Sequence, residues 1–255
     1  MSWAARRRFL YLLGLAIIVG ALTLIPTYIH FKQPPTCFDG KQNQGETQVD
    51  KGGPCSVLDE NALIPLAVQW ARAFPTQEGL YNAVAYIENA NEGAGVRELR
   101  YEMKLYDSRN VLVAVRAGKT FIMPGSVNPI FEARIEAGNR VVTRAFLDVT
   151  PQPQWERAED RARMMVIENV RPSSETTAPR IDATVHSVRA VSTTDVKVVA
   201  VAFDTAGNAF AGSRTALDIM QPDERKEVSF TWPQPWIFTV GRIDVLPVVE
   251  PEWTR

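Results

Sequence analysis

The pattern of apolar and polar residues changes twice along this chain. Residues Phe9 to Ile29 contain no charged side chain, residues 33–61 are poor in apolar side chains, and from Ala62 onward short apolar runs alternate with polar residues. The first pattern predicts a helix, and the second predicts a segment without a core of its own. The third predicts half-buried strands that are bounded by Gly, Pro, Asn and Asp.

The apolar run from Phe9 to Ile29 has the length of a membrane span. A helix of about 21 residues measures about 30 Å, which matches the hydrocarbon core of a bilayer. Arg6, Arg7 and Arg8 precede it, and such a cluster stays on the cytoplasmic side. We therefore expect residues 1–8 in the cytoplasm, a signal anchor over 9–29 in the cell membrane, and an extracytoplasmic remainder. A cleavable signal peptide is disfavoured because no small-residue cleavage site follows the run.

Residues 30–61 are expected to form a stalk next to the membrane, since they are rich in Pro, Gly, Asn, Gln and acidic residues. They contain Cys37 and Cys55, the only two cysteines of the chain. An even number of cysteines on the exported side is most simply explained by a disulfide. The sequence thus predicts one loop closed by a Cys37 to Cys55 bond.

The stalk also resembles a cysteine-rich segment of extracellular bacterial proteins, of the form C-x-D-G-x-x-N-x-x-E-x-x-V-D-C-G-G-P-C. Lys51 stands where that segment has a further cysteine, so its full bridging scheme cannot form here. The resemblance implies an exported module and no particular activity. The matching residues are Cys37, Asp39, Gly40, Asn43, Glu46, Val49, Asp50, Gly52, Gly53, Pro54 and Cys55.

Four oxygen-bearing residues of the stalk, Asp39, Asn43, Glu46 and Asp50, are candidate ligands for Ca²⁺, which prefers carboxylate and carbonyl oxygens. Their spacing does not fit an EF-hand loop. The preferred interpretation is a solvated, turn-rich loop held by the disulfide. No cofactor is therefore expected, and calcium is the alternative.

Two segments of the β region repeat each other. Leu99 to Leu105 alternates strictly between apolar and polar residues, and Asp195 to Phe203 does much the same. An offset of 97 residues superposes Val84 to Asp107 on Ile181 to Asp204 without a gap. Short strands at this spacing are typical of immunoglobulin-like sandwiches. The expected fold class is all-β, with two tandem immunoglobulin-like β-sandwiches after one N-terminal transmembrane helix.

The end of the alternating strand carries a short motif. Met103-Lys104-Leu105-Tyr106-Asp107 resembles the FxLYD signature of a bacterial extracellular immunoglobulin-like domain, with Met in the Phe position, and Ala200 to Asp204 is a looser second copy. The resemblance implies a surface-exposed β-sandwich without assigned chemistry. We place the first sandwich at 62–150 and the second at 164–255. Residues 151–163, with two prolines and a mixed-charge run, are expected to link them.

Charge and motif content narrow the function. The net charge is -1, but residues 33–255 hold 24 basic against 29 acidic side chains. Such a mildly acidic body lacks the positive field that phosphate contacts require, which argues against nucleic acid as a partner. Nucleophile triads, HExxH sites and phosphate-binding Gly-rich loops are absent from the sequence. His30 and His186 are its only histidines. We therefore expect no enzyme activity.

These observations predict a membrane-anchored structural or interaction protein with a protein partner in the envelope or at the cell surface. Trp232 and Trp236 are the candidate binding residues, because they flank a Pro-Gln-Pro segment and exposed Trp favours glycan or protein contacts. Packing in the sandwich core is the competing interpretation for both. A carbohydrate-binding surface module is the first alternative function. The second is an exported hydrolase, which would need acidic residues clustered in a cleft.

Overall fold

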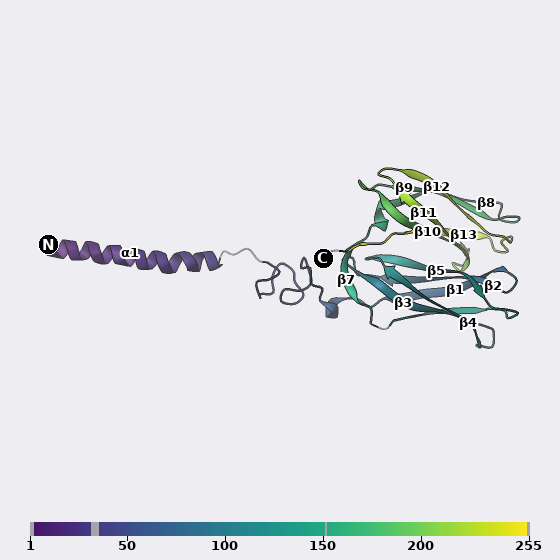
Figure 1. Ribbon diagram of the computed structural model, residues 1–255, viewed down its shortest axis with the longest axis horizontal. Helices are drawn as coiled ribbons and strands as arrows, with labels where there is room; N and C mark the ends of the chain where they lie inside the picture. Colours follow the sequence, from purple (N-terminus) through teal and green to yellow (C-terminus); the bar gives the residue numbers. More distant parts are fainter. Residues whose placement is uncertain (1–2, 32–35, 151, 254–255) are drawn as a thin grey trace. The chain divides into compact units, whose positions relative to one another are not determined.

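The computed structural model describes residues 3–31, 36–150 and 152–253 and divides into two compact units, Met1–Cys55 and Ser56–Arg255 (Figure 1). The first unit contains the only α-helix among the described residues, and the second contains the strands β1 to β14. Most described residues of the second unit lie in strands. The all-β prediction with one N-terminal apolar helix is therefore confirmed.

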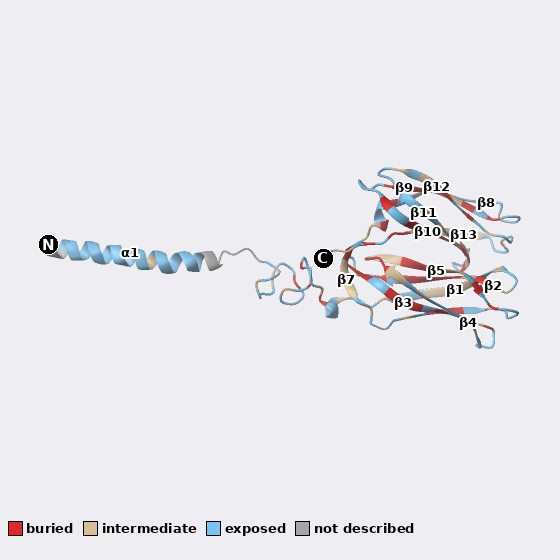
Figure 2. Ribbon diagram, in the orientation of Figure 1, coloured by how far each residue is buried: buried red, intermediate tan, exposed pale blue. Residues whose placement is uncertain are grey.

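Helix α1 spans Trp3–Phe31, and its stretch Arg6–Tyr28 is long and apolar enough to cross a membrane. Its described side chains are almost all exposed (Figure 2). The hydroxyl groups of Thr23 and Thr27 donate to carbonyl oxygens one turn earlier, at 2.9 and 2.7 Å. Both polar side chains are thus satisfied within the helix, which suits an apolar surrounding. The helix predicted over Phe9 to Ile29 is confirmed and extends beyond that range at both ends.

The first sandwich packs two antiparallel sheets around an apolar core. One sheet has the order β1, β2, β5, and the other has β4, β3 and β6, with β7 continuing beside the other end of β3. Leu99, Met103 and Leu105, the apolar side of the alternating run, are fully buried in this core. The strands are β1 (Ala67–Gln77), β2 (Leu80–Asn89), β3 (Ala94–Tyr106), β4 (Leu112–Ile122), β5 (Ser126–Glu136), β6 (Arg144–Val149) and β7 (Trp155–Glu159), preceded by a short 3-10 helix (Glu60–Ala62).

The second sandwich repeats this connectivity. Its sheets have the orders β8, β9, β12 and β11, β10, β13. In both copies one sheet joins the first, second and fifth strands while the other joins the third and sixth, as in immunoglobulin-like sandwiches. The strand orders therefore confirm the internal repeat. The elements are a 3-10 helix (Ala162–Met164), β8 (Met165–Ser173), β9 (Arg180–Ser187), β10 (Thr193–Asp204), β11 (Ala209–Met220), β12 (Arg225–Thr231), β13 (Val240–Val248) and β14 (Glu252–Trp253).

A third apolar core joins the two sandwiches. Side chains from β1, β2 and β5 meet side chains from β10 and the start of β11 there. Arg72 of β1 also donates hydrogen bonds to Asn208 Oδ1 (2.8 Å) and to the carbonyl oxygen of Ala209 (3.3 Å). The sheet of β1, β2 and β5 thus lies between its own partner sheet and the sheet of β10 (Figure 1). The apolar residues of this core are Phe74, Val84, Tyr86, Phe131, Val199, Val201, Phe203, Ala209 and Val248.

Strand β10 is buried on both faces, whereas half-buried strands were expected from the sequence. Val198 and Ala200 point into the second core, whereas Val199, Val201 and Phe203 point into the core between the sandwiches. A half-buried strand would expose one of these two sets to water. The near-continuous apolar run of β10 follows from its place between two packed layers.

The segment 151–163, predicted to be a linker, contains the strand β7. Residues 155–157 of β7 pair with 94–96 of β3, so this stretch completes the sheet of the first sandwich. Its backbone groups find partners there, which a free linker would have to leave to water. The two-residue strand β14 pairs in turn with β7 and brings residues 252–253 back to the first sandwich.

Candidate functional site

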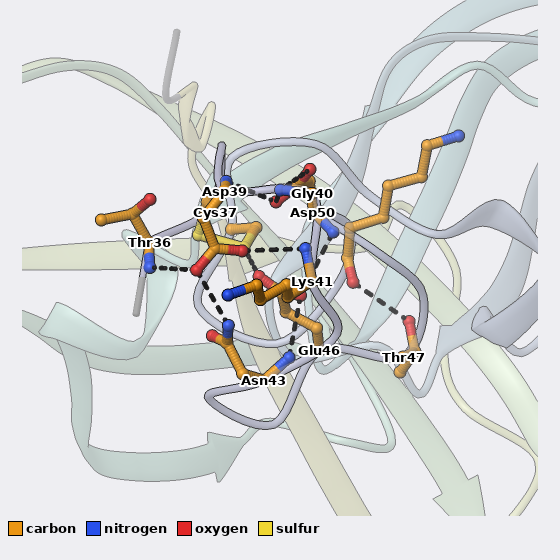
Figure 3. Close-up of a disulfide and its surroundings, with 11 residues drawn as sticks. Thr36, Cys37, Asp39, Gly40, Lys41, Asn43, Glu46, Thr47 and Asp50 are labelled. Carbon is orange, nitrogen blue, oxygen red and sulfur yellow. Dashed lines mark hydrogen bonds between the residues drawn. A yellow bond between two sulfur atoms is a disulfide. The ribbon is translucent and has the colours of Figure 1, made fainter. Parts of the chain in front are cut away.

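The stalk loop is closed by the predicted disulfide between Cys37 and Cys55, whose Cα atoms lie 5.3 Å apart (Figure 3). Glu46 is 6% exposed and lies beside it, with Oε1 at 3.1 Å from the Cys55 sulfur. Both sulfur atoms are used in the disulfide, so the cluster of Cys37, Cys55 and Glu46 offers a metal ion one carboxylate only. The residues hold the loop together and do not form a thiolate metal site.

The four candidate calcium ligands lie in one hydrogen-bonded loop, as Figure 3 shows. Asp50 accepts the backbone N–H groups of Asp39 and Gly40 at 3.1 and 3.0 Å. Glu46 accepts those of Asn43 and Asp50 at 3.2 and 3.1 Å. These carboxylates therefore satisfy backbone donors that the polar sequence cannot place in a helix or sheet.

Asp39 completes this network. Its carboxylate accepts the side-chain amide of Asn43 at 3.0 Å and the backbone N–H of Lys41 at 2.9 Å. The hydrogen bond from Asn43, followed by the backbone bonds, holds the pKa of Asp39 below its usual value. The arrangement favours a loop built from its own acceptors, and calcium binding by the stalk stays the untested alternative.

Trp232 and Trp236 lie close together in the loop between β12 and β13, with ring centroids 5.0 Å apart. Both rings are half-buried and pack against the core of the second sandwich. Neither indole Nε1 atom has a hydrogen-bond partner among the described residues, although both are buried. The core contact that competes with a binding role is thus present for both.

The exposed apolar side chains of this loop are the next two residues. Ile237 is 87% exposed and Phe238 is 47% exposed. Phe210 contacts Trp236 on one side and Phe238 on the other, at ring-centroid distances of 5.4 and 5.5 Å. A cavity of about 160 Å³ adjoins them and reaches Phe74 of the first sandwich. Sequence reasoning missed Ile237 and Phe238 because it searched this loop for Trp alone.

The two copies of the aspartate motif have the same local geometry. Asp107 Oδ1 accepts the backbone N–H groups of Arg109 and Val111 at 3.0 and 2.9 Å. Asp204 Oδ1 does the same two and four residues further on, at 2.9 and 2.7 Å. In each copy the bond from the fourth residue is the largest cause of a pKa below the usual value for Asp. The motif aspartate therefore closes the hairpin between the third and fourth strands.

We expect Asp204→Ala to lower the Tm of the protein by a few degrees, because two backbone donors of the hairpin lose their acceptor. Asp204→Asn keeps an oxygen at the same place and is expected to retain most of the stability. Differential scanning calorimetry of both variants measures the difference. Equal losses in the two variants would show that the side-chain acceptor is not what stabilises the turn.

His186 is the one histidine with a described side chain. Its Nε2 lies 2.7 Å from Asp223 Oδ1, and its Nδ1 lies 3.1 Å from Arg225 Nη2 and 3.4 Å from Glu168 Oε1. The hydrogen bond from His186 holds the pKa of Asp223 below its usual value. No nucleophilic side chain is among these partners. The contacts join polar residues of β8, β9 and β12 and of the turn before β12.

Comparisons with known proteins do not extend this picture. No protein-family model matches the chain. No curated protein matches it either. A solved structure, red sea bream transglutaminase, aligns with 8% identity and a TM-score of 0.24, covering 74% of this chain and 32% of that one. A similarity of this degree carries no argument about function.

Proposed function

We propose that this chain is a membrane-anchored extracytoplasmic protein that presents two immunoglobulin-like sandwiches to a protein partner in the envelope or at the cell surface. The apolar helix α1 and the arginines at 6–8 support an anchor with its N-terminus in the cytoplasm. The disulfide between Cys37 and Cys55 supports an oxidising compartment for the stalk. The third apolar core supports a rigid pair of sandwiches.

The observation that carries the binding role is the exposure of Ile237 and Phe238 beside a cavity. Large apolar side chains that are left in water next to a recess are typical of protein docking surfaces. The cavity of about 160 Å³ has aromatic walls from Phe210 and Trp236. An apolar side chain of a partner would fill it.

The domain type belongs to the same proposal. The resemblance to an FxLYD-type domain is supported by the β-sandwich fold of both copies and by the motif aspartate that closes a hairpin in each. In the first copy Met103 fills a fully buried position in the core, where an apolar side chain of similar volume serves as well as Phe.

Capture from envelope fractions tests the binding role. The full-length protein in detergent is expected to retain a specific protein, and Ile237→Asp with Phe238→Asp is expected to lose it. Val188→Asp is the matched control, because Val188 is also exposed (47%) and lies elsewhere in the second sandwich. Identical capture by all three forms, or none by the wild type, would contradict the proposed surface.

The orientation has its own test. Alkaline phosphatase folds only outside the cytoplasm, so a fusion after residue 255 is expected to be active and a fusion before residue 6 inactive. The reverse pattern would contradict the orientation that the arginine cluster predicts.

A further inference from the structure

Strand β6 is an open edge of the first sandwich. It pairs with β3 on one side, and no strand in the described part of the chain pairs with it on the other. In an immunoglobulin-like sandwich the seventh strand occupies that edge. Here the chain continues from β6 to β7, which pairs with residues 94–96 of β3. The backbone groups along the outer side of β6 are therefore available to another strand.

The edge of β6 lacks the proline, glycine and bulge that protect many edge strands. Its sequence, Arg-Ala-Phe-Leu-Asp-Val, has neither Pro nor Gly, and the central Phe146 is 50% exposed. Strand β13, its equivalent in the second copy, contains both Gly241 and Pro247. Proline on an edge strand removes a donor and discourages pairing. Of these two equivalent strands, β6 is therefore the one whose edge can pair with another strand.

There is room beside this edge. A cavity of about 500 Å³ is lined by residues 143–146, by residues 71–75 of β1 and, from the second sandwich, by Asp204, Asn208, Ala209, Phe210 and Phe238. A strand that approaches β6 from outside meets this recess first.

The outer face of the same sheet carries an apolar patch that runs from Phe146 on the edge strand across β3 to β4. Leu112, Val115 and Phe146 are 44%, 45% and 50% exposed. Val115 and Phe146 lie opposite Lys104 on its two neighbouring strands, and Leu112 lies opposite Tyr106. The rings of Tyr106 and Phe146 are 5.5 Å apart. Pairing of two copies along this edge would bring their two apolar patches together and bury apolar side chains of both copies.

The sequence of β6 is complementary to itself. Arg144, Phe146 and Asp148 are its exposed residues. An antiparallel copy centred on Phe146 places Arg144 opposite Asp148 and Phe146 opposite its own equivalent. Opposite charges and facing aromatic rings both stabilise cross-strand pairs. Asp148 contacts Lys104 Nζ at 2.6 Å, and Lys104 keeps Glu102 at 3.1 Å as a second partner. Asp148 can thus form an additional ion pair with Arg144 of the second copy.

We propose that two copies of this protein associate by antiparallel pairing of their β6 strands about a two-fold axis at Phe146. The β6 strand of each copy takes the place of the missing seventh strand of the other. The pairing is isologous and therefore closes at the dimer. The paired residues 144–148 do not include Phe210, Ile237 or Phe238, although Phe210 and Phe238 also line the recess beside β6.

Site-directed cross-linking tests the register. The natural cysteines form a disulfide, and no free cysteine is present among the described residues. Phe146→Cys in the full-length protein in detergent is expected to give a covalent dimer under mild oxidation, because opposite Cα atoms of paired strands lie within disulfide range. Arg144→Cys and Asp148→Cys are expected to cross-link when mixed and not alone. Val141→Cys, exposed (70%) in the preceding loop, is the control that should stay monomeric.

Charge reversal tests the same contact without new thiols. Asp148→Arg places like charges at both ends of the paired strands, and we expect roughly a tenfold or greater rise in the dimer Kd by sedimentation velocity. Arg144→Asp combined with Asp148→Arg restores the opposite signs and is expected to restore the dimer. Ile237→Asp should leave it unchanged.

A monomeric wild type, or cross-linking of Arg144→Cys alone as efficient as that of Phe146→Cys, would overturn the proposal. A dimer that Asp148→Arg leaves intact would place the contact elsewhere and overturn it as well. Because residues 144 and 148 are exposed, unchanged circular dichroism and Tm in these variants would separate a lost contact from a lost fold.

Discussion

Val201→Asp is expected to separate the two sandwiches and to lower the free energy of unfolding by about 3–5 kcal/mol. Val201 is 0% exposed and lies in the apolar core between the sandwiches. Arg242 and Arg214 lie over the rings of Phe203 and Phe131 of this core, but the residue opposite Val201 on β13 is Asp244. A carboxylate at position 201 would therefore be buried beside a like charge. Each sandwich retains its own core, and therefore separation is expected before either one unfolds.

Urea unfolding followed by tryptophan fluorescence and by circular dichroism measures this effect. The wild-type unit is expected to unfold in one transition and the variant in two, with the two probes no longer coincident. Val166→Asp is the matched control, because Val166 is 40% exposed on β8 and should tolerate the charge. A single transition with unchanged midpoint in Val201→Asp would show that the interface does not couple the sandwiches.

Removing the disulfide is expected to unfold the stalk while the sandwiches keep their stability. The Cys37 to Cys55 bond joins residues 18 apart, and no apolar core cluster includes stalk residues. A loop of this length gains about 3 kcal/mol from such a constraint in the chain-entropy description. The hydrogen bonds of Asp39, Glu46 and Asp50 depend on the closed loop, so we expect them to be lost together.

Hydrogen exchange of the double variant Cys37→Ser, Cys55→Ser tests this expectation. Backbone amides of residues 39–55 should exchange faster by two orders of magnitude or more, whereas amides of β3 and β10 should keep their protection. The wild type under reducing conditions is the control without substitution. Protected stalk amides in the double variant would mean that the carboxylate network folds the loop without the bond.

The sequence predicted the parts of the fold that local patterns determine. Three predictions could be made from a single segment or from its comparison with its repeat. They are the apolar helix at 9–29, the pairing of Cys37 with Cys55 and the repeat at an offset of 97 residues. The structure bears out all three as an apolar helix, a disulfide and a repeated strand order. Orientation in a membrane and the domain family remain proposals.

Contacts between distant segments were not predictable in the same way. Alternation along β10 shows that a face is buried but not what covers it, and here the two faces serve two different cores. The run from Val198 to Phe203 is apolar at every position, which is the signal for burial on both sides. Strand β14 has two residues, too few for any periodic pattern, so its pairing with β7 had no sequence signal.

The candidate site was predicted by residue type, and this criterion missed the exposed residues of the loop. Trp232 and Trp236 were singled out as aromatic residues, and both turned out to pack against the core. Ile237 and Phe238 follow them and are exposed, although nothing in their identity marks them as surface residues. Exposure of a large apolar side chain is a property of the folded loop and requires the structure.

The pairing of β14 with β7 determines when the first sandwich can be completed during synthesis of the chain. Synthesis proceeds from the N-terminus, and β7 ends at Glu159 while β14 begins at Glu252. At the usual rates of translation this interval lasts about 5–20 s. Throughout that time the newly made first sandwich has an unfilled place beside β7. Residues 252–253 fill it, so the first sandwich is completed only after the second has been synthesised.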